Sequence, residues 1–292
     1  MVVSIESLRC FDKLIWLQTG DQVSGRLELT QASVSRAAHR VANTFGVALE
    51  KQRGEWTVIG DQSLLNAERL VHQQFRWQRD LRLRIEAQYY NGPLFLDPLP
   101  AGWVAGCFNF VQTKKPLELL RNGVIDAWLG CFPDLPEPDD DTLTSIHLTR
   151  LPTHLAVAAD HPLVRLGDAV SLEDVRAYPC LALPDGAFPR IQAVLEQLGL
   201  WNSLEAMQRY DHNRWEGRTA DQLTVAYASA FSVGLFNTPH VLLPITIPLQ
   251  VGDSLVIKRC YADHPRALLM IAALRQRARQ LAAQFPDVSL VQ

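Results

Sequence analysis

The sequence predicts an α/β protein that opens with an all-α head carrying a small two-stranded wing. In the first 60 residues, apolar side chains recur at helical spacing, as at Ile5, Leu8 and Phe11. After Asn91-Gly92-Pro93, short strand-like runs alternate with helical runs, a pattern typical of α/β architecture. The 292 residues carry 48% hydrophobic side chains and a net charge of −3, a composition that can form a core and that excludes a disordered chain.

The head is expected to hold three short helices followed by the wing. The first helix ends at Thr19-Gly20-Asp21, and residues 23–27 form the second. Thr30 can cap a third helix over residues 31–45, which Gly46 ends. Residues 47–59 fit a hairpin that turns at Gly54.

A long linker helix is expected from Gln62 to about Gln88, capped by Asp61. A helix of this length with one apolar stripe, outside a compact core, needs a partner helix, so the stripe predicts dimerisation. The stripe residues assigned to the dimer contact are Leu64, Val71, Phe75, Leu81 and Ile85.

The remaining chain, residues 91–292, is the α/β body. Its expected strands lie at residues 94–96, 107–111, 127–130, 155–159, 180–183 and 255–261. Its expected helices lie at residues 116–122, 171–175, 188–198 and 265–284. Residues 222–252 carry no charged side chain, but Pro239, Pro244 and Pro248 interrupt them, which predicts buried strands and turns and no contact with a membrane.

Several classes of protein are disfavoured. The five cysteines include no C-x-x-C pair, and the first residues do not resemble a signal peptide, so we expect a cytoplasmic protein without disulfides, bound metal or cofactor. Cys131 with His147 or His154 is the conceivable catalytic pair, but no nucleophile elbow or phosphate loop accompanies it. We therefore expect no catalytic residue and no enzymatic activity. For Cys131 and Cys180, a redox-sensing role is favoured over catalysis, and a structural role as a free buried cysteine is favoured over both.

The third helix carries the informative pattern. Between Leu29 and Leu49 there is no acidic residue, and Ser33, Arg36 and Arg40 share one helix face. A polar, basic face on the second helix of a helix-turn-helix is what reading the DNA major groove requires. Gln31 can bond an adenine edge and Arg36 a guanine or a phosphate, while Thr30, Ser33 and Ser35 suit phosphate oxygens. The competing interpretation is an ordinary amphipathic surface helix.

These segments resemble the LysR-type transcriptional regulators. The resemblance rests on Leu8-Arg9-Cys10-Phe11, on Thr30-Gln31-Ala32-Ser33-Val34-Ser35-Arg36, on Phe45-Gly46-Val47, and on Leu49 and Ile59. It continues at Asp160-His161-Pro162-Leu163 and at Ser171-Leu172-Glu173-Asp174-Val175, and so covers nearly the whole chain.

The resemblance implies a winged helix-turn-helix at residues 1–60 and a dimerising linker helix at 61–90. It also implies a two-lobed, periplasmic-binding-protein-like (type 2) effector domain at 91–292, with lobe I at 91–153 plus 263–292 and lobe II at 154–262. The expected function is sequence-specific regulation of transcription by a homodimer or homotetramer on a pseudo-palindromic double-stranded operator. RNA polymerase and a small-molecule effector are further candidate partners.

Two departures from the family pattern matter. The wing has Glu50-Lys51-Gln52 where the family often has Phe-x-Arg. This change either weakens the contact of the wing with phosphate or leaves it to Lys51 and Arg53, which join the third helix as candidate DNA contacts. The first lobe lacks roughly a dozen residues after its first strand, about the length of a short helix. A shortened lobe keeps open an alternative, a regulator of DNA or a protein partner that needs no effector.

The effector cleft is expected at the carboxyl ends of strands between the two lobes. The candidate effector-binding residues are Asp97, Cys131, Asp185, Gly186, Thr219 and Asn237.

Overall fold

The computed structural model describes residues 2–52, 54–79, 81–181, 184, 186–201, 207, 209–211, 223–235 and 239–291. These residues form two compact units. The first contains residues 1–86, 101–107 and 117–127, and the second contains residues 87–100, 108–116 and 128–292. In the described part of the chain, no helix combines the length and the apolar character needed to cross a membrane. The expected domain limits at residues 60 and 90 stay predictions.

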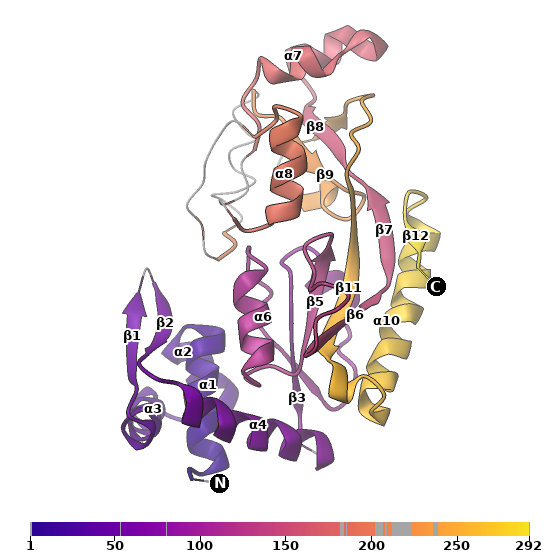
Figure 1. Cartoon of the computed structure of the whole chain (residues 1–292). Coiled ribbons are helices and arrows are strands. Elements are labelled where there is room, and N and C mark those ends of the chain that lie inside the picture. Colours follow the sequence, from indigo (N-terminus) through magenta and orange to yellow (C-terminus); the bar gives the residue numbers. More distant parts are fainter. Residues whose placement is uncertain are drawn as a thin grey trace. The chain divides into compact units, whose positions relative to one another are not determined.

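The head consists of three helices, α1 (Ile5–Leu17), α2 (Gly20–Leu27) and α3 (Gln31–Phe45) (Figure 1). Each begins at a hydroxyl cap, because the side chains of Ser4, Thr19 and Thr30 accept hydrogen bonds from backbone N–H groups of the first turns. Gly46 ends α3 at φ 66°, a backbone conformation that glycine adopts without strain. The expected third helix is confirmed at its residues, and the second begins at Gly20, earlier than expected.

The wing is a hairpin of β1 (Ala48–Gln52) and β2 (Glu55–Ile59). The strands are antiparallel, with Ala48 opposite Ile59 and Lys51 opposite Trp56. Gly54, at φ 86°, lies in the turn, as the sequence predicts.

The linker helix is shorter than expected. Helix α4 covers Ser63–Gln78, and Leu83–Ala87 form strand β3 where the helix was expected to continue to about Gln88. The reason is visible in the sequence, since Leu81, Leu83 and Ile85 alternate with charged residues, and a period of two belongs to a strand. The expectation that Leu81 and Ile85 extend the helical stripe is therefore wrong.

Strand β3 pairs in parallel with β4 (Trp103–Ala105), with Leu83 opposite Trp103. The strand expected at residues 107–111 is wrong, because the strand in this region, β4, ends at Ala105 and Phe110 forms only isolated bridges. Helix α6 (Lys114–Arg121) confirms the expected helix near residues 116–122.

In the second unit, one sheet has the order β12-β7-β11-β5, and β6 also pairs with β11. Its strands are β5 (Ala127–Phe132), β6 (Leu143–His147), β7 (Thr149–Pro152), β11 (Gln250–Lys258) and β12 (Ser289–Leu290). Helix α10 (Pro265–Gln284) runs beside these strands, and η4 (Arg259–Tyr261) leads to it (Figure 1). Helix α5 (Gly92–Phe95) occupies the place where a strand at residues 94–96 was expected. This helix has only four residues, and the expected shortening of the first lobe stays a prediction.

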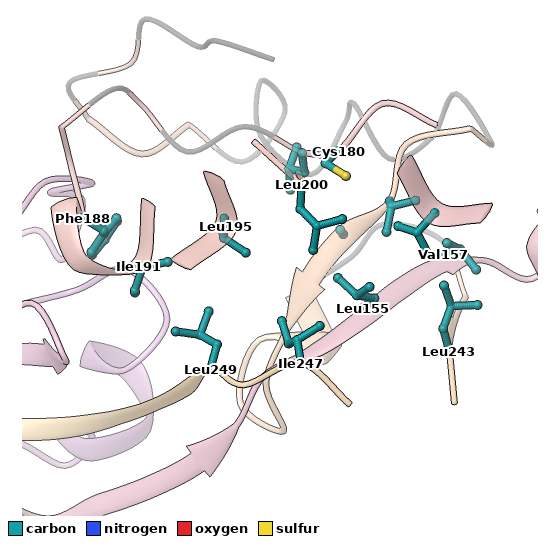
Figure 2. Packing of buried hydrophobic residues seen from close by; sticks show 14 of the residues in the cluster. Leu155, Val157, Cys180, Phe188, Ile191, Leu195, Leu200, Leu243, Ile247 and Leu249 are labelled. Carbon is teal, nitrogen blue, oxygen red and sulfur yellow. The ribbon is translucent and has the colours of Figure 1, made fainter. Parts of the chain in front are cut away.

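The second lobe contains an antiparallel sheet of order β10-β8-β9. Its elements are β8 (His154–Ala158), η1 (Pro162–Ala169), α7 (Leu172–Arg176), α8 (Pro189–Gln197), β9 (Ala226–Ala228), η3 (Val233–Leu235) and β10 (His240–Leu242). Figure 2 shows its core, in which Leu155 and Val157 of β8 lie among apolar side chains of α8 and of residues 243–249. Of the strand expected at 180–183, Cys180 forms an isolated bridge with Val225, while residues 182 and 183 lie outside the described residues.

Two strands connect the lobes of this unit. β7 leads into β8, and β11 begins after the loop that follows β10. The two strands are paired at the crossing, with Gln250 opposite Pro152 and Val251 opposite Leu151. Residues at this crossing are therefore placed to face a cavity between the lobes.

Candidate functional site

Helix α3 has one buried face and one exposed face. Val34, Ala38 and Val41 are buried, while Arg36 and Arg40 are exposed. Packing of the apolar face on α1 and α2 leaves the basic face toward solvent. This is the arrangement that a recognition helix needs, because its base-reading side chains must project freely.

Local hydrogen bonds organise the start of α3. The Thr30 hydroxyl lies 2.9 Å from that of Ser33, and Nη2 of Arg36 donates to Oγ of Ser33 at 3.1 Å. The side-chain amide of Gln31 donates to the carboxylate of Asp21 on α2. This surface contact links the first residue of α3 to α2.

The exposed face of α3 continues beyond the predicted residues. A shallow hollow is lined by Arg36, His39, Arg40, Asn43 and Thr44. The sequence prediction did not assign His39, Asn43 or Thr44 to this face, although positions 36, 39, 40 and 43 share one helix face by spacing alone.

The remaining predicted DNA contacts are exposed or lie outside the described residues. Ser35 is exposed on α3, and Lys51 is exposed on β1. Arg53, at the tip of the wing, lies outside the described residues.

Helix α4 exposes part of its predicted dimer stripe. Leu64 is 71% exposed and Val71 is 48% exposed, whereas Phe75 is half-buried. Leu81 lies beyond the helix, and Ile85 is fully buried in β3. The structure therefore places only Leu64, Val71 and Phe75 together on the linker helix.

The second unit contains a cavity of about 100 Å³ at the strand crossing. None of its described lining residues is charged; they are Tyr89, Tyr90, Cys131, Thr153, Leu181, Phe188, Ile191, Tyr227, Ala228, Ser229, Ser232, Leu249 and Val251. Within the described part of the chain, the buried Thr153 hydroxyl has no hydrogen-bond partner. A buried hydroxyl without a partner is costly, so this cavity favours a ligand or a water that bonds to it.

Cys131, at the end of β5, contributes a thiol to this cavity. Burial raises the pKa of Cys131 to about 12, while a hydrogen bond with Tyr90 lowers it in part. The thiol is thus protonated at neutral pH, and a protonated thiol is a poor nucleophile. This environment favours a packing role for Cys131 over the redox role.

The predicted effector residues are only partly brought together. Cys131 lines the cavity, whereas Asp97 and Gly186 are exposed and do not line it. Gly186, at φ 66°, is a turn residue whose N–H donates to Oε1 of Gln192 at 2.9 Å. Asp185, Thr219 and Asn237 lie outside the described residues.

Sequence reasoning missed the tyrosines of the cavity. Tyr89 and Tyr90 come two and three residues after the end of β3, at the carboxyl end of a strand, where ligands bind in α/β sheets. The alternation of apolar and charged residues in β3 is present in the sequence. Because the first strand of the body was expected at residues 94–96, the tyrosines were not recognised as residues at a strand end.

A buried carboxylate lies next to the strand crossing. Oδ1 of Asp253 accepts from the Asn91 side chain at 2.9 Å, and Oδ2 accepts from the Thr149 hydroxyl at 2.6 Å. Burial nevertheless raises the pKa of Asp253 to about 6, against the lowering effect of these hydrogen bonds. In the described residues, no three His, Cys, Asp or Glu side chains form a group that could hold a metal ion.

Comparison with known proteins shows which family shares this architecture. The family model described as the LysR substrate binding domain matches residues 108–279, more than half of the chain. The chain belongs to the LysR-type transcriptional regulator family. No curated protein matches it significantly in sequence.

Solved structures support the LysR-type fold over the whole chain. A full-length OxyR variant from Pseudomonas aeruginosa has a TM-score of 0.59 at 18% identity, with 99% of each chain covered. A probable transcriptional regulator from the same organism has a TM-score of 0.57 at 18% identity, covering 94% of this chain and 97% of that one. CbnR, solved in complex with its target DNA, has a TM-score of 0.52 at 17% identity, covering 95% of this chain and 99% of that one. These likenesses confirm the expected fold class, helical head and two-lobed domain included.

Proposed function

We propose that this LysR-type protein regulates transcription by binding a specific DNA sequence through the exposed face of α3. The main support is that α3 buries only its apolar face: Arg36 and Arg40 are exposed to solvent, while Val34 and Val41 are buried. In this account Gln31 reads a base, and Arg36, Arg40 and the hydroxyls of Thr30, Ser33 and Ser35 bind the backbone. Lys51 and Arg53 of the wing add phosphate contacts, and the site of action is the cytoplasm.

The proposed active form is a homodimer joined through α4. Two exposed apolar side chains one heptad apart, Leu64 and Val71, offer a seam for an identical helix. A twofold pair of α3 helices would then enter successive major grooves, about 34 Å apart, on a pseudo-palindrome. The proposal also includes the association of dimers into tetramers and a contact with RNA polymerase.

We further propose that the cavity at the strand crossing binds a small uncharged effector, aromatic or aliphatic. Burying a carboxylate among uncharged side chains would be unfavourable, since none of the described lining residues provides a cation. Thr153 supplies the polar contact that orients the ligand, and the tyrosine rings supply its apolar walls.

The DNA-binding proposal can be tested by selecting sequences from a random duplex pool with the full-length protein. We expect enrichment of inverted half-sites with centres about 10 base pairs apart. A folded protein that enriches no sequence would overturn the proposal.

The effector proposal can be tested by thermal unfolding with pairs of small molecules. Each pair consists of an uncharged aromatic amide and the carboxylate that corresponds to it. The uncharged partner should raise Tm by mass action, and Thr153→Val should reduce the shift. A larger shift from the carboxylate would refute an uncharged ligand. No shift from either class would favour the effector-independent regulator.

A further inference from the structure

A second hollow lies entirely within the first unit, apart from the cavity at the strand crossing. It has a volume of about 380 Å³ and is bordered by α1, α4 and the residues of β3 and β4. Six basic side chains line it: Arg9, Lys13, Arg26, Arg76, Arg82 and Arg84. The acidic side chain in the described lining is Asp12. The hollow therefore concentrates positive charge.

The nearby carboxylates are already engaged. Asp12 is shared by two arginines, with Nε of Arg69 at 2.8 Å and Nη1 of Arg84 at 3.5 Å. Asp126 accepts two hydrogen bonds from Arg76, at 3.1 and 3.0 Å. Each of these two acids is thus paired with arginine. Among the described residues, no ion pair is present to Arg9, Lys13, Arg26 or Arg82, the other cations of the hollow.

Two further acids near the hollow are also committed. Glu68 accepts from the N–H of Val2 and lies 3.1 Å from the ring of His72. Glu86 accepts from the indole of Trp16 at 2.6 Å. Both carboxylates therefore have hydrogen-bond partners of their own.

Lys13 shows the imbalance most clearly. It is only 7% exposed, and in the described part of the chain no hydrogen bond or ion pair to its ammonium group is present. Burial, together with the neighbouring charges of Arg84, Arg9 and Arg26, lowers the pKa of Lys13 to about 8. A largely buried lysine whose nearest charged neighbours are arginines is an unfavourable arrangement, which a bound anion would relieve.

Several of the arginines are held rigidly in place. Arg26 donates to the carbonyl oxygens of Ala105 and Gly106, and Arg84 donates to that of Val124 at 2.8 Å. Fixed cations around a free volume need no reorganisation when an anion enters, which favours binding.

We propose that this hollow is a binding site for a small phosphate-bearing molecule. Lys13, Arg9 and Arg82 would contact the phosphate oxygens. Arg26 would supply further positive charge, as would Arg69 and Arg84, which share the single carboxylate of Asp12. Arginine forks and lysine point charges are the donors that phosphate oxygens prefer. Lys13 is only 7% exposed, which favours a small anion over the backbone of a DNA duplex. The site is thus distinct from the DNA-binding face and from the uncharged cavity.

The test is titration of the full-length protein with inorganic phosphate and pyrophosphate at constant ionic strength, followed by thermal unfolding and calorimetry. We expect a saturable rise in Tm and a stoichiometry of one anion per chain. Lys13→Met should abolish the rise while increasing Tm in the absence of phosphate, because it removes a buried charge. The exposed Arg82→Gln should weaken binding at least tenfold without affecting folding.

Arg275→Gln, an exposed arginine on α10 outside the hollow, is the matched control and should bind as the wild type does. Equal Tm shifts in wild type, Lys13→Met and Arg82→Gln would mean a general salt effect and would overturn the proposal. A stronger response to citrate than to pyrophosphate would overturn the assignment to phosphate. Because no DNA is present, these outcomes do not depend on the DNA-binding proposal.

Discussion

Arg76 and Asp126 form a buried ion pair in which Nε of the arginine lies 3.1 Å from Oδ2 and Nη2 lies 3.0 Å from Oδ1. The same Nη2 donates to the carbonyl of Gly123 at 2.7 Å, and Gln73 donates to Oδ1 at 3.0 Å. The pair therefore ties the last turn of α4 to the segment after α6. It fixes the end of the linker helix, which stops two residues later at Gln78.

Removing one partner of this pair should destabilise the protein strongly. Arg76→Met leaves the Asp126 carboxylate buried without its cation, so we expect a loss of about 3–5 kcal/mol in the free energy of unfolding. Urea denaturation measures it. The matched control is Arg176→Met, which breaks the exposed pair with Glu173 and should cost under about 1 kcal/mol. Equal losses for the two variants would contradict the structural role of the Arg76–Asp126 pair.

The head was predictable because its signals are local. Caps at Thr30 and Gly46, together with the turn at Gly54, define α3 and the wing without reference to distant residues. The secondary structure after Gln78 was not predictable in this way, because the sequence there continues the helical stripe of α4 and also shows the period-two alternation of β3. The burial of Arg84 and Glu86 depends on partners distant in sequence, Asp12 and Trp16, which spacing cannot reveal.

The candidate sites divide in the same way. The proposed DNA-binding face of α3 lies on one helix, so helical periodicity alone brings Ser33, Arg36 and Arg40 together. The uncharged cavity draws on Tyr90, Thr153 and Tyr227, which come from segments far apart in sequence, and only Cys131 was predicted. Three of the predicted effector residues, Asp185, Thr219 and Asn237, lie outside the described residues.

Stability should fall as pH rises through the titration of Asp253. Its folded pKa, about 6, lies above the unfolded value of about 3.9, so the folded state binds the extra proton between these values. This contribution is fully present below about pH 4 and is lost as pH rises through 6, a change on the order of 3 kcal/mol. Denaturation of wild type and Asp253→Asn from pH 4 to 8 isolates it. A difference between the two that does not change with pH would refute the raised pKa.

Charge on the α4 stripe should disrupt the proposed dimer. Val71→Asp places a carboxylate on the seam, so we expect monomers in sedimentation equilibrium and a large loss of DNA affinity. Since Val71 is 48% exposed, the fold itself should change in stability by no more than about 0.5 kcal/mol. Leu166→Asp, at a residue 43% exposed in η1, is the control and should stay dimeric. A dimeric Val71→Asp would remove α4 from the interface.

Gln31→Ala should relax sequence preference. Loss of a bidentate base contact costs about 1–3 kcal/mol of discrimination at one operator position and little elsewhere. Competition binding with single-base operator variants measures it, with the exposed Gln74→Ala on α4 as the control. Unchanged discrimination at every position would show that Gln31 does not read a base.

The most direct test of the central claim is binding to the DNA upstream of the protein's own gene across a salt series, for wild type, Arg36→Ala and Arg275→Ala. We expect selective binding by wild type and Arg275→Ala. If Arg36 contacts a phosphate, Arg36→Ala should bind more weakly, with a salt slope smaller by about one. Identical affinity and slope for all three proteins would contradict the assignment of α3 as the DNA-binding element.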